Sequence, residues 1–598
     1  MKLRPEVARN RLLSWFSRDS VAADVLMSRA MEALRRPVLF LALFTPILLG
    51  LTRSAQQTGD ALLYAYSIRT GVDLFHPHHL LYAPVVRALY LGLAPILGSA
   101  SWDALAAAQL HGIAWATVAV TFFYLTARRV LDWPAAAVLG ALGLLFTQGF
   151  WMLATHANSY VPALGCLSIV LWLLVRRDPT SIDRGELIAV SLAWGLSVLY
   201  HQVNVLFAIP LLYYLRSASG RPLGRIAPAV LLPAGIVSAG AYAVVIAATR
   251  VEAGAGGLWR FPLDYALHPN PTWGTLGNVS PSGVAALLTN QAWGLLALHR
   301  TLEGIFVTLI TALVVALGAW HARQVLRRAR WSPFRMLLML WVGTYLTFYL
   351  WWLPHHKPFF VLTTLPIVLL ALMAFVDLAQ STAYFRVGRA AAAGALGVIV
   401  ATTGLFHLGA VIRPLHTLQR PAYHEAESLN DLVDPSCYIM APFEVAQALR
   451  YHFDRPRAAH ARFPLLCTYQ GKPIPAEFDI RKGECVVIAA QYLRPDRRLY
   501  GFDATGSPER WEAYLDWLFD FRSTPEGRRV ESNDVRALRT ATGADYIAIL
   551  SSRQPVDGLR GFLESLDALG ASVSVWSDRP FVRWLDDPDA APPPGGSP

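Results

Sequence analysis

Residues 37–64 read PVLFLALFTPILLGLTRSAQQTGDALLY. No charged residue occurs between positions 37 and 52, and a polar run then leads to Asp60. About 20 mostly apolar residues cross the hydrocarbon core of a bilayer, and shorter runs suffice where the bilayer is thinned. We therefore interpret 38–52 as a first membrane span. We expect no signal peptide in the first 37 residues, because their charges are scattered and no cleavage site follows the apolar run.

Similar apolar runs recur along the first 411 residues and predict a polytopic membrane domain. Ten further spans are expected at 105–127, 134–153, 160–175, 186–200, 203–215, 228–249, 301–322, 336–353, 358–376 and 390–411. The run 80–98 contains Arg87 and several prolines and glycines, so we interpret it as a helix lying along the membrane interface. The predicted fold class is an all-α membrane domain of about 11 transmembrane helices with a C-terminal soluble α/β domain.

Composition agrees with this class and excludes several others. Apolar residues make up 54% of the 598 positions and charged residues only 16%, against about 25% charged in soluble domains. Disorder, a collagen and a small disulfide scaffold are excluded. Nucleic-acid binding is not expected despite the net charge of +11, because the surplus arginines stand in short patches between apolar runs.

The positions of these arginines predict the orientation, because Lys and Arg concentrate on the cytoplasmic side of membrane spans. With the amino terminus inside, the segments between spans place 23 Lys and Arg inside and seven outside. Arginines flank both ends of 186–215, so this stretch is expected to turn back at His201–Gln202. Eleven spans then put the C-terminal tail outside the cytoplasm. The expected location is the inner (plasma) membrane.

Four regions follow from this topology. They are a basic cytoplasmic segment at 1–37, a membrane domain at 38–411 with a first outer loop at 53–104, an outer α/β domain at 412–585, and a disordered end at 586–598. In the tail, alternating patterns predict four helices and four strands. The helices are expected at Tyr423–Leu432, Phe443–Phe453, Pro508–Arg522 and Gly558–Leu569, and the strands at Cys437–Ala441, Glu484–Tyr492, Tyr546–Ser551 and Val573–Trp576. One disulfide among Cys437, Cys467 and Cys485 is compatible with an oxidising environment.

The first outer loop carries the candidate chemistry. Asp60 lies eight residues after the first span, where a carboxylate is costly to keep charged without a role or a partner. Partial desolvation would raise its pKa, which suits a general base. The histidines of His76-Pro77-His78-His79 could hydrogen-bond a phosphate or a sugar, lie at the interface, or bind a metal.

These features resemble the GT-C membrane glycosyltransferases, in the branch of the protein O-mannosyltransferases and aminoarabinose transferases. Asp60 matches the leading Asp of that group's first loop. The segment from His76 and Pro77 to Leu81 and Tyr82 matches its His-Pro…Leu-Tyr element, and Phe150-Trp151 through Tyr160 resembles its Trp…Glu-x-Tyr element. The sequence departs from the pattern in having Leu62-Leu63 instead of Gly-Glu after the Asp, and no Glu before Tyr160.

The resemblance implies a sugar donor on a polyprenyl phosphate and a transfer that inverts the anomeric centre. Asp60 is then the expected base. We expect the lipid phosphate at His355-His356-Lys357, because Lys357 is the only lysine between Lys2 and Lys472 and lies at an outer span end. The remaining expected substrate-binding residues are His76, His78, His79, Tyr82, Arg69 and Tyr160. The second outer loop, 154–159, has no acid, so we expect no metal and no other cofactor.

The sequence therefore predicts a glycosyltransferase of the outer membrane face. Its expected partners are a polyprenyl-phosphate-linked sugar, a protein, lipid or glycan acceptor, and the lipid bilayer, but no nucleic acid. The alternative is a transporter or flippase of lipid-linked glycans, for which midplane charges or paired broken helices would be expected. A non-catalytic scaffold would leave the Asp-bearing loop unexplained.

Overall fold

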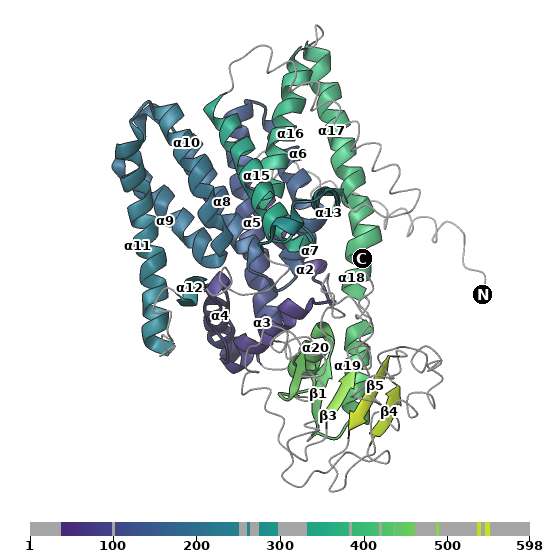
Figure 1. The fold of residues 1–598 in the computed structure, drawn as a ribbon. Coiled ribbons are helices and arrows are strands. Elements are labelled where there is room, and N and C mark those ends of the chain that lie inside the picture. The colour runs from purple at the N-terminus through teal and green to yellow at the C-terminus, as the bar shows by residue number, and fades with distance from the viewer. Residues whose placement is uncertain are drawn as a thin grey trace, which may run out of the picture.

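The computed structural model describes residues 37–98, 102–249, 260–263, 274–296, 332–381, 385–417, 421–435, 437–460, 486–489, 535–539 and 544–549. Over these residues, long helices form a bundle and a smaller unit with a β-sheet lies beyond one end of it (Figure 1). The predicted span 301–322 and the predicted disordered end 586–598 lie outside the described residues.

Most apolar runs form helices at or near the expected bounds. The helices of the bundle are α2 (Pro37–Leu51), α5 (Ala104–Leu131), α6 (Pro134–Leu145), α7 (Gln148–Thr155), α8 (Tyr160–Val175), α9 (Arg184–Tyr200), α10 (Ala208–Ser219), α11 (Leu223–Thr249), α13 (Pro281–Leu296), α15 (Pro333–Trp352), α16 (Val361–Ser381) and α17 (Phe385–His407). Five described helices are long and apolar enough to cross a membrane, or six if α6 and α7 form one span. The exposed face of α11 carries Ile236 and Val244, which suits contact with lipid tails.

Helix α5 lies at the centre of the bundle and packs against α2, α6 and α8. Its buried face carries small residues, including Ala107, Gly112 and Ala116. Small residues let helix backbones approach closely, which is how transmembrane helices pack when water provides no driving force between them.

The predicted span 134–153 bends by 61° between α6 and α7; at the break, the Thr147 hydroxyl donates to the Leu144 carbonyl over 2.8 Å and so pairs one carbonyl that the helix end leaves free. The stretch 186–215 does turn back, since the Tyr214 hydroxyl near the end of α10 donates to the Leu174 carbonyl at the end of α8. The expected hairpin is thus confirmed.

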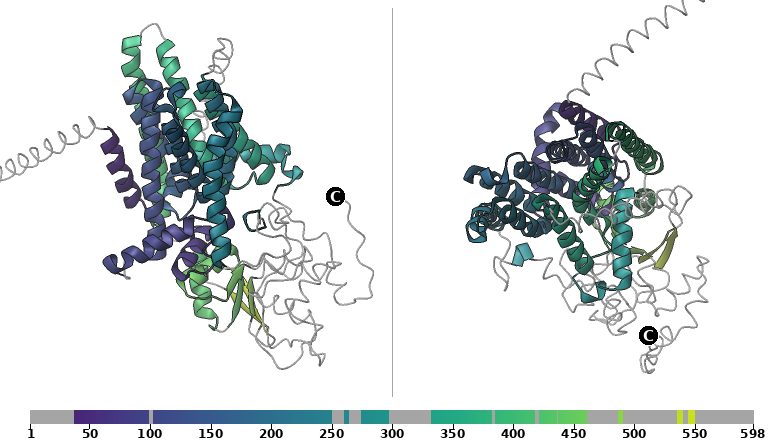
Figure 2. Two further views of the ribbon diagram at one scale, coloured as in Figure 1. Left: turned by 90° about the vertical axis from the view of Figure 1, so that its left-hand side faces the viewer. Right: turned by 90° about the horizontal axis from the view of Figure 1, so that it is seen from above.

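The first outer loop forms two helices at the end of the bundle nearest the sheet. They are α3 (Gly59–Thr70) and α4 (Tyr82–Leu97), joined through the short helix η1 (Pro77–His79). Helix α4 runs across the end of the bundle rather than along it (Figure 2). It buries Tyr82 and Val86 but exposes Leu91 and Ile96, as expected of a helix at the membrane interface. The charge of Arg87 is accommodated in this segment, because its guanidinium donates to the Ile68 and Arg69 carbonyls at the end of α3.

The described part of the tail contains helices packed on a five-stranded sheet. The helices are α19 (Pro421–Leu432) and α20 (Phe443–His452), and the strands are β1 (Tyr438–Ala441), β2 (Ala458–His460), β3 (Val486–Ala489), β4 (Val535–Arg539) and β5 (Asp545–Ile549). The strand order is β2-β1-β3-β5-β4, with β1 parallel to β2 and β3 and with β5 antiparallel to β3 and β4. Strand β1 lies between β2 and β3 and is wholly buried. Helix α20 packs against α3, so the tail contacts the first outer loop.

Candidate active site

Asp60 lies in the first turn of α3, which Thr58 begins by accepting a hydrogen bond from the Ala61 N–H. Its side chain is accessible, yet protein atoms surround it closely. This burial, together with the nearby Glu444 carboxylate, raises the pKa of Asp60 to about 6. At neutral pH most molecules therefore hold an ionised carboxylate that is much more basic than an ordinary aspartate.

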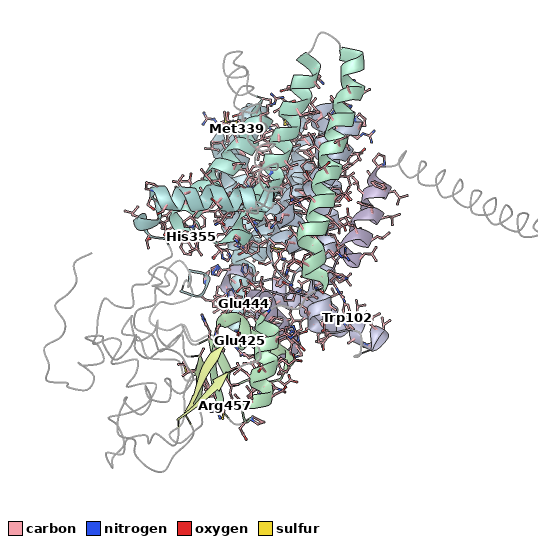
Figure 3. All side chains as sticks on the ribbon, turned by 90° about the vertical axis from the view of Figure 1, so that its right-hand side faces the viewer. Trp102, Met339, His355, Glu425, Glu444 and Arg457 are labelled. Atoms are coloured by element: carbon pink, nitrogen blue, oxygen red, sulfur yellow. The ribbon has the colours of Figure 1, made fainter. Side chains whose placement is uncertain are left out.

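Glu444 comes from the start of α20, on the side of the tail that faces the helices (Figure 3). The approach of α20 to α3 depends on Gly59, because a Cβ at that position would lie 3.4 Å from the Glu444 Cα and only 2.5 Å from the Phe443 ring. A cavity of about 50 Å³ remains beside Glu444, between the loop and the tail. The tail thus brings a second carboxylate towards Asp60, where the sequence offers none on the loop itself.

Five histidines form a cluster at the ends of the helices near α3. This histidine cluster consists of His76, His78, His79, His201 and His356. His79 is central, with its ring centroid 5.4 Å from that of His76, 5.5 Å from that of His78 and 4.6 Å from that of His201. The members come from η1 and the residue before it, from the end of α9 and from the loop before α16. The bundle thus brings together residues up to 280 positions apart in the sequence.

Tyr160, the first residue of α8, joins the two sides of the cluster. Its hydroxyl lies 3.0 Å from His356 Nε2, and its ring centroid lies 4.5 Å from that of His201. Next to it, the Ser159 hydroxyl lies 2.9 Å from His79 Nδ1. These contacts fix the ring orientations from the start of one helix.

The cluster connects to Asp60 through α3. Tyr64 lies one helical turn after Asp60, on the same face, and its ring centroid is 5.9 Å from that of His79 and 5.2 Å from that of Tyr82. Tyr64 therefore links the face of α3 that carries Asp60 to the histidine cluster.

Burial keeps four of the clustered imidazoles neutral. It lowers the pKa of His201 to about 3 and that of His356 to about 4, and it lowers the pKa of His78 and His79 well below the usual value. A neutral imidazole has one N–H donor and one acceptor nitrogen. Among the described residues, no three His, Cys, Asp or Glu side chains are placed to hold a metal ion. The cluster is therefore suited to hydrogen bonding with a ligand.

The structure separates the three residues expected to hold the phosphate. His356 belongs to the cluster, whereas His355 and Lys357 are exposed. The Lys357 ammonium lies 5.0 Å from the centre of the Trp293 ring on α13, a cation–π arrangement. Lys357 thus lies outside the histidine cluster, and its long side chain is exposed.

Arg69 contacts the tail. Its guanidinium donates to the Tyr451 and Arg450 carbonyls over 2.9 and 3.2 Å and pairs with Asp454 over 2.7 Å. The two carbonyls belong to the last turn of α20, where backbone acceptors have no partner within the helix. Arg69 therefore connects the first outer loop to the tail.

We expect the ion pair of Arg69 with Asp454 to contribute less to stability than the hydrogen bonds from Arg69 to the two α20 carbonyls. Asp454 is 80% exposed, so Asp454→Ala should lower the free energy of unfolding by less than about 1 kcal/mol. Arg69→Ala also leaves two carbonyls unpaired and should cost about 1–3 kcal/mol. Thermal unfolding of the purified variants in detergent measures both changes. Equal losses would contradict the dominance of the carbonyl contacts.

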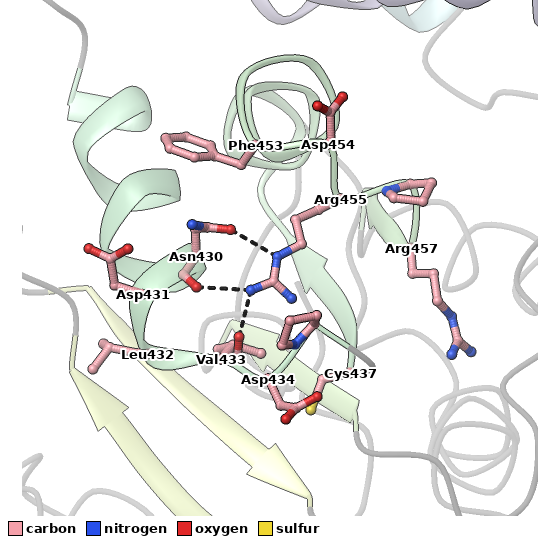
Figure 4. Close-up of a pocket in the computed structure, with 12 residues that line it drawn as sticks. Asn430, Asp431, Leu432, Val433, Asp434, Cys437, Phe453, Asp454, Arg455 and Arg457 are labelled. Atoms are coloured by element: carbon pink, nitrogen blue, oxygen red, sulfur yellow. Dashed lines mark hydrogen bonds between the residues drawn. The ribbon is translucent and has the colours of Figure 1, made fainter.

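A larger cavity, of about 580 Å³, lies within the tail (Figure 4). Arg455 crosses its wall and donates to the Asn430 side chain and to the Asn430 and Val433 carbonyls. These bonds satisfy backbone acceptors at the end of α19. None of the predicted site residues lines this cavity, so it is separate from the region around Asp60.

Sequence reasoning missed two residues of the region. His201 was expected only as the turn of a hairpin, and Glu444 only as part of a tail helix. A histidine between two apolar runs is the only local signal for His201, and it does not indicate which other segments it meets. Glu444 has no local signal, because its proximity to Asp60 arises from the docking of α20 on α3.

Comparisons with known proteins support the membrane-enzyme interpretation of this architecture. Residues 99–221, which contain α5 to α10, match the model of the protein O-mannosyl-transferase TMEM260 N-terminal domain. Two crystal structures of ArnT from Cupriavidus metallidurans are similar over 87% and 88% of this chain and 98% and 100% of theirs, each with a TM-score of 0.50 and 13% identity. One is bound to undecaprenyl phosphate and the other is in the apo state. No curated protein sequence matches the chain.

The resemblance to the GT-C membrane glycosyltransferases is confirmed by these matches. The chain has a fold similar to that of ArnT, and five or six of its described helices are long and apolar enough to cross a membrane.

Proposed function

We propose that this protein is a membrane glycosyltransferase that moves a sugar from a polyprenyl-phosphate donor to an acceptor hydroxyl on the outer face of the membrane. The observation that carries the proposal is Asp60, an accessible carboxylate with a pKa raised to about 6, beside a cluster of neutral imidazole groups. A general base works best when its pKa lies near the operating pH. The neighbouring imidazoles and hydroxyls supply hydrogen bonds for a polar ligand.

In the proposed reaction, the acceptor oxygen attacks the anomeric carbon while Asp60 takes the hydroxyl proton. The bond between the anomeric carbon and the phosphate oxygen breaks on the opposite side of the sugar, so the transfer inverts the anomeric centre. The lipid phosphate leaves with the bonding electrons. Asp60 forms no bond to the sugar in this scheme and releases its proton to solvent afterwards.

The donor-binding part of the proposal uses the residues at the helix ends. His76, His78 and His79 approach from the first outer loop, and Tyr160 and His356 face them. Lys357 at the rim and the exposed His355 supply further donors for the phosphate. Tyr82 packs edge-to-face against Tyr64 and so supports the residue that links α3 to the histidine cluster. The lipid in the ArnT structure, undecaprenyl phosphate, supports a polyprenyl chain as the carrier.

We propose the same topology and domain limits for the whole chain. About 11 spans at 38–411 leave the segment 1–37 in the cytoplasm and the α/β domain at 412–585 outside it, in the inner (plasma) membrane. Two observations support this orientation: the 23-to-7 distribution of basic residues, and the disulfide bond of Cys437, which suits an oxidising compartment. In this orientation the tail, α3 and the histidine cluster share the outer side.

The direct test is an assay of the purified protein in proteoliposomes with a polyprenyl-phosphate sugar. Transfer predicts that polyprenyl phosphate is released and that the sugar appears on an added hydroxyl acceptor. A protein that moves the intact lipid-linked sugar across the bilayer, without breaking the sugar–phosphate bond, would instead be a flippase. Measuring cleavage and transbilayer movement in one preparation separates the two functions.

Glu444→Gln should shift the pH dependence of the transfer. Removing this carboxylate lowers the pKa of Asp60, so the acidic limb of kcat/KM moves to lower pH. The shift should be less than half of the difference between about 6 and the ordinary value of 3.8, because burial is the larger cause of the raised pKa. A pH–rate profile measures the midpoint.

Glu425→Gln is the matched control for this experiment. Glu425 also lies on the tail, in α19 and farther from the bundle than Glu444 (Figure 3). Glu425 is not among the groups that raise the pKa of Asp60. The pH–rate profile of Glu425→Gln should therefore match that of the unchanged protein. An unmoved acidic limb in Glu444→Gln would disprove the electrostatic coupling.

A further inference from the structure

His201 has a definite proton arrangement. At the end of α9, its Nδ1 accepts a hydrogen bond from the Val203 N–H over 3.3 Å and caps the short helix η3 (Gln202–Phe207). Burial keeps the ring neutral by lowering its pKa to about 3. A neutral imidazole carries one proton, so that proton is on Nε2.

The Nε2–H group of His201 has no hydrogen-bond partner among the described residues. The side chain is only 3% exposed, so bulk water does not compensate. Such orphaned donors are rare in native structures, and each calls for an explanation. Its neighbours are rings: those of Tyr160, His79 and Phe359 lie 4.5, 4.6 and 5.9 Å away between centroids.

Two polar atoms on these neighbouring rings already have partners of their own. The Tyr160 hydroxyl is paired with His356, and His79 Nδ1 is paired with Ser159 and the Tyr200 carbonyl. The Nε2–H group of His201 is therefore available to an acceptor atom of a ligand. A phosphoryl oxygen suits this donor, because it accepts hydrogen bonds and carries no competing proton.

We propose that His201 donates its Nε2–H to a phosphoryl oxygen of the lipid-linked donor and is a substrate-binding residue of the transfer. This assignment rests on the proposed function. It adds a residue from the α9–α10 hairpin to the loop residues predicted for the phosphate. It also gives the hairpin a role in binding, because the same ring caps η3 with one nitrogen and binds the ligand with the other.

The decisive variant is His201→Asn. An asparagine side-chain oxygen can take over the cap of η3, while the Nε2–H group disappears. We expect affinity for undecaprenyl phosphate to fall by about tenfold or more, as for loss of a hydrogen bond to a charged group. Binding of undecaprenol, which lacks the phosphate, should not change. The melting temperature should stay equal or rise, because an unpaired buried donor has been removed.

His201→Gln is the second variant, because its longer amide can place an N–H near the position of Nε2 and should restore part of the affinity. His407→Asn is the control. His407 is also buried, but its ring hydrogen-bonds the Phe146 carbonyl and is not part of the histidine cluster. His407→Asn should therefore lower the melting temperature and leave phosphate binding unchanged.

The outcomes separate this inference from the proposed function. Suppose that the unchanged protein transfers sugar and that His201→Asn binds undecaprenyl phosphate with unchanged affinity. The proposed role of His201 would then be overturned, while the proposed function would stand. A lowered melting temperature with unchanged affinity would make His201 purely structural. Equal weakening of undecaprenol and undecaprenyl phosphate would also overturn it, because a lost phosphate contact spares the alcohol. If the unchanged protein binds the lipid phosphate but transfers no sugar, the transferase proposal fails while the His201 contact stands.

Discussion

Asp60→Asn is expected to lower sugar transfer by about 10²–10⁴-fold, the usual contribution of a general base, while donor binding remains largely intact. Asparagine keeps the size and most hydrogen bonds of aspartate but cannot accept the acceptor's proton. The contacts proposed for the lipid phosphate lie in the histidine cluster and at Lys357, so the substitution does not remove them. Turnover and binding of the same polyprenyl-phosphate sugar, measured on one preparation, check both statements.

The folded protein should tolerate this change at neutral pH. The pKa of Asp60 is higher in the folded state than its ordinary value of 3.8, so ionising this group opposes folding. That destabilisation develops as pH rises from about 4 to about 6 and is fully present at pH 7. Asp60→Asn should therefore have an unchanged or higher melting temperature at pH 7, and this difference should disappear below pH 4.

Asp73→Asn provides the control on the same loop. Asp73 is exposed and has a positive φ of 48°, a conformation that asparagine also tolerates. Its turnover should match that of the unchanged protein. Near-normal turnover of Asp60→Asn would remove Asp60 from the mechanism and favour the flippase.

Gly59→Ala is expected to disrupt the junction between the first outer loop and the tail. The added methyl group would lie 2.5 Å from the Phe443 ring, a distance at which one of the two helices must move. Overpacking of this kind costs about 1–3 kcal/mol. Because Asp60 is the next residue, the displacement should also reduce turnover, which distinguishes this variant from a distant destabilising change. Thermal unfolding and turnover of the purified variant measure the two effects.

The double variant Gly59→Ala/Phe443→Ala tests the cause. Removing the ring creates room for the methyl group, so the double variant should regain part of the stability lost by Gly59→Ala. Phe443→Ala alone should lose stability by leaving a gap at the junction. Strictly additive losses in this cycle would show that residues 59 and 443 do not interact.

The positions of the membrane helices could be predicted because length and apolarity are local properties. A helix that crosses a bilayer must satisfy its own backbone and present apolar side chains to lipid, and both requirements are visible in runs such as 105–127 and 160–175. The break between α6 and α7 was not predicted. The polar pair Thr147-Gln148 stands at this point of the apolar run 134–153, but two polar residues do not by themselves tell a bent helix from a continuous one.

The candidate site was only partly predictable for a related reason. Asp60, His76 and Tyr160 stand out in the sequence because polar residues are conspicuous near apolar runs. His201 and Glu444 are equally polar but have ordinary local roles, in a turn and in the first turn of a helix. Only their neighbours distinguish them, and these neighbours lie 122 positions away at His79 for His201 and 384 positions away at Asp60 for Glu444.

The sequence by itself determined that this protein crosses the membrane many times and carries a carboxylate and several histidines where its first span ends. The tertiary structure alone decided that Arg69 faces the tail, that Glu444 approaches Asp60, and that His356 and His201 meet the loop histidines. The reason is that span formation depends on contacts with lipid, which every apolar run makes independently. A site depends on contacts between helix ends, which exist only once the bundle and the tail have packed together.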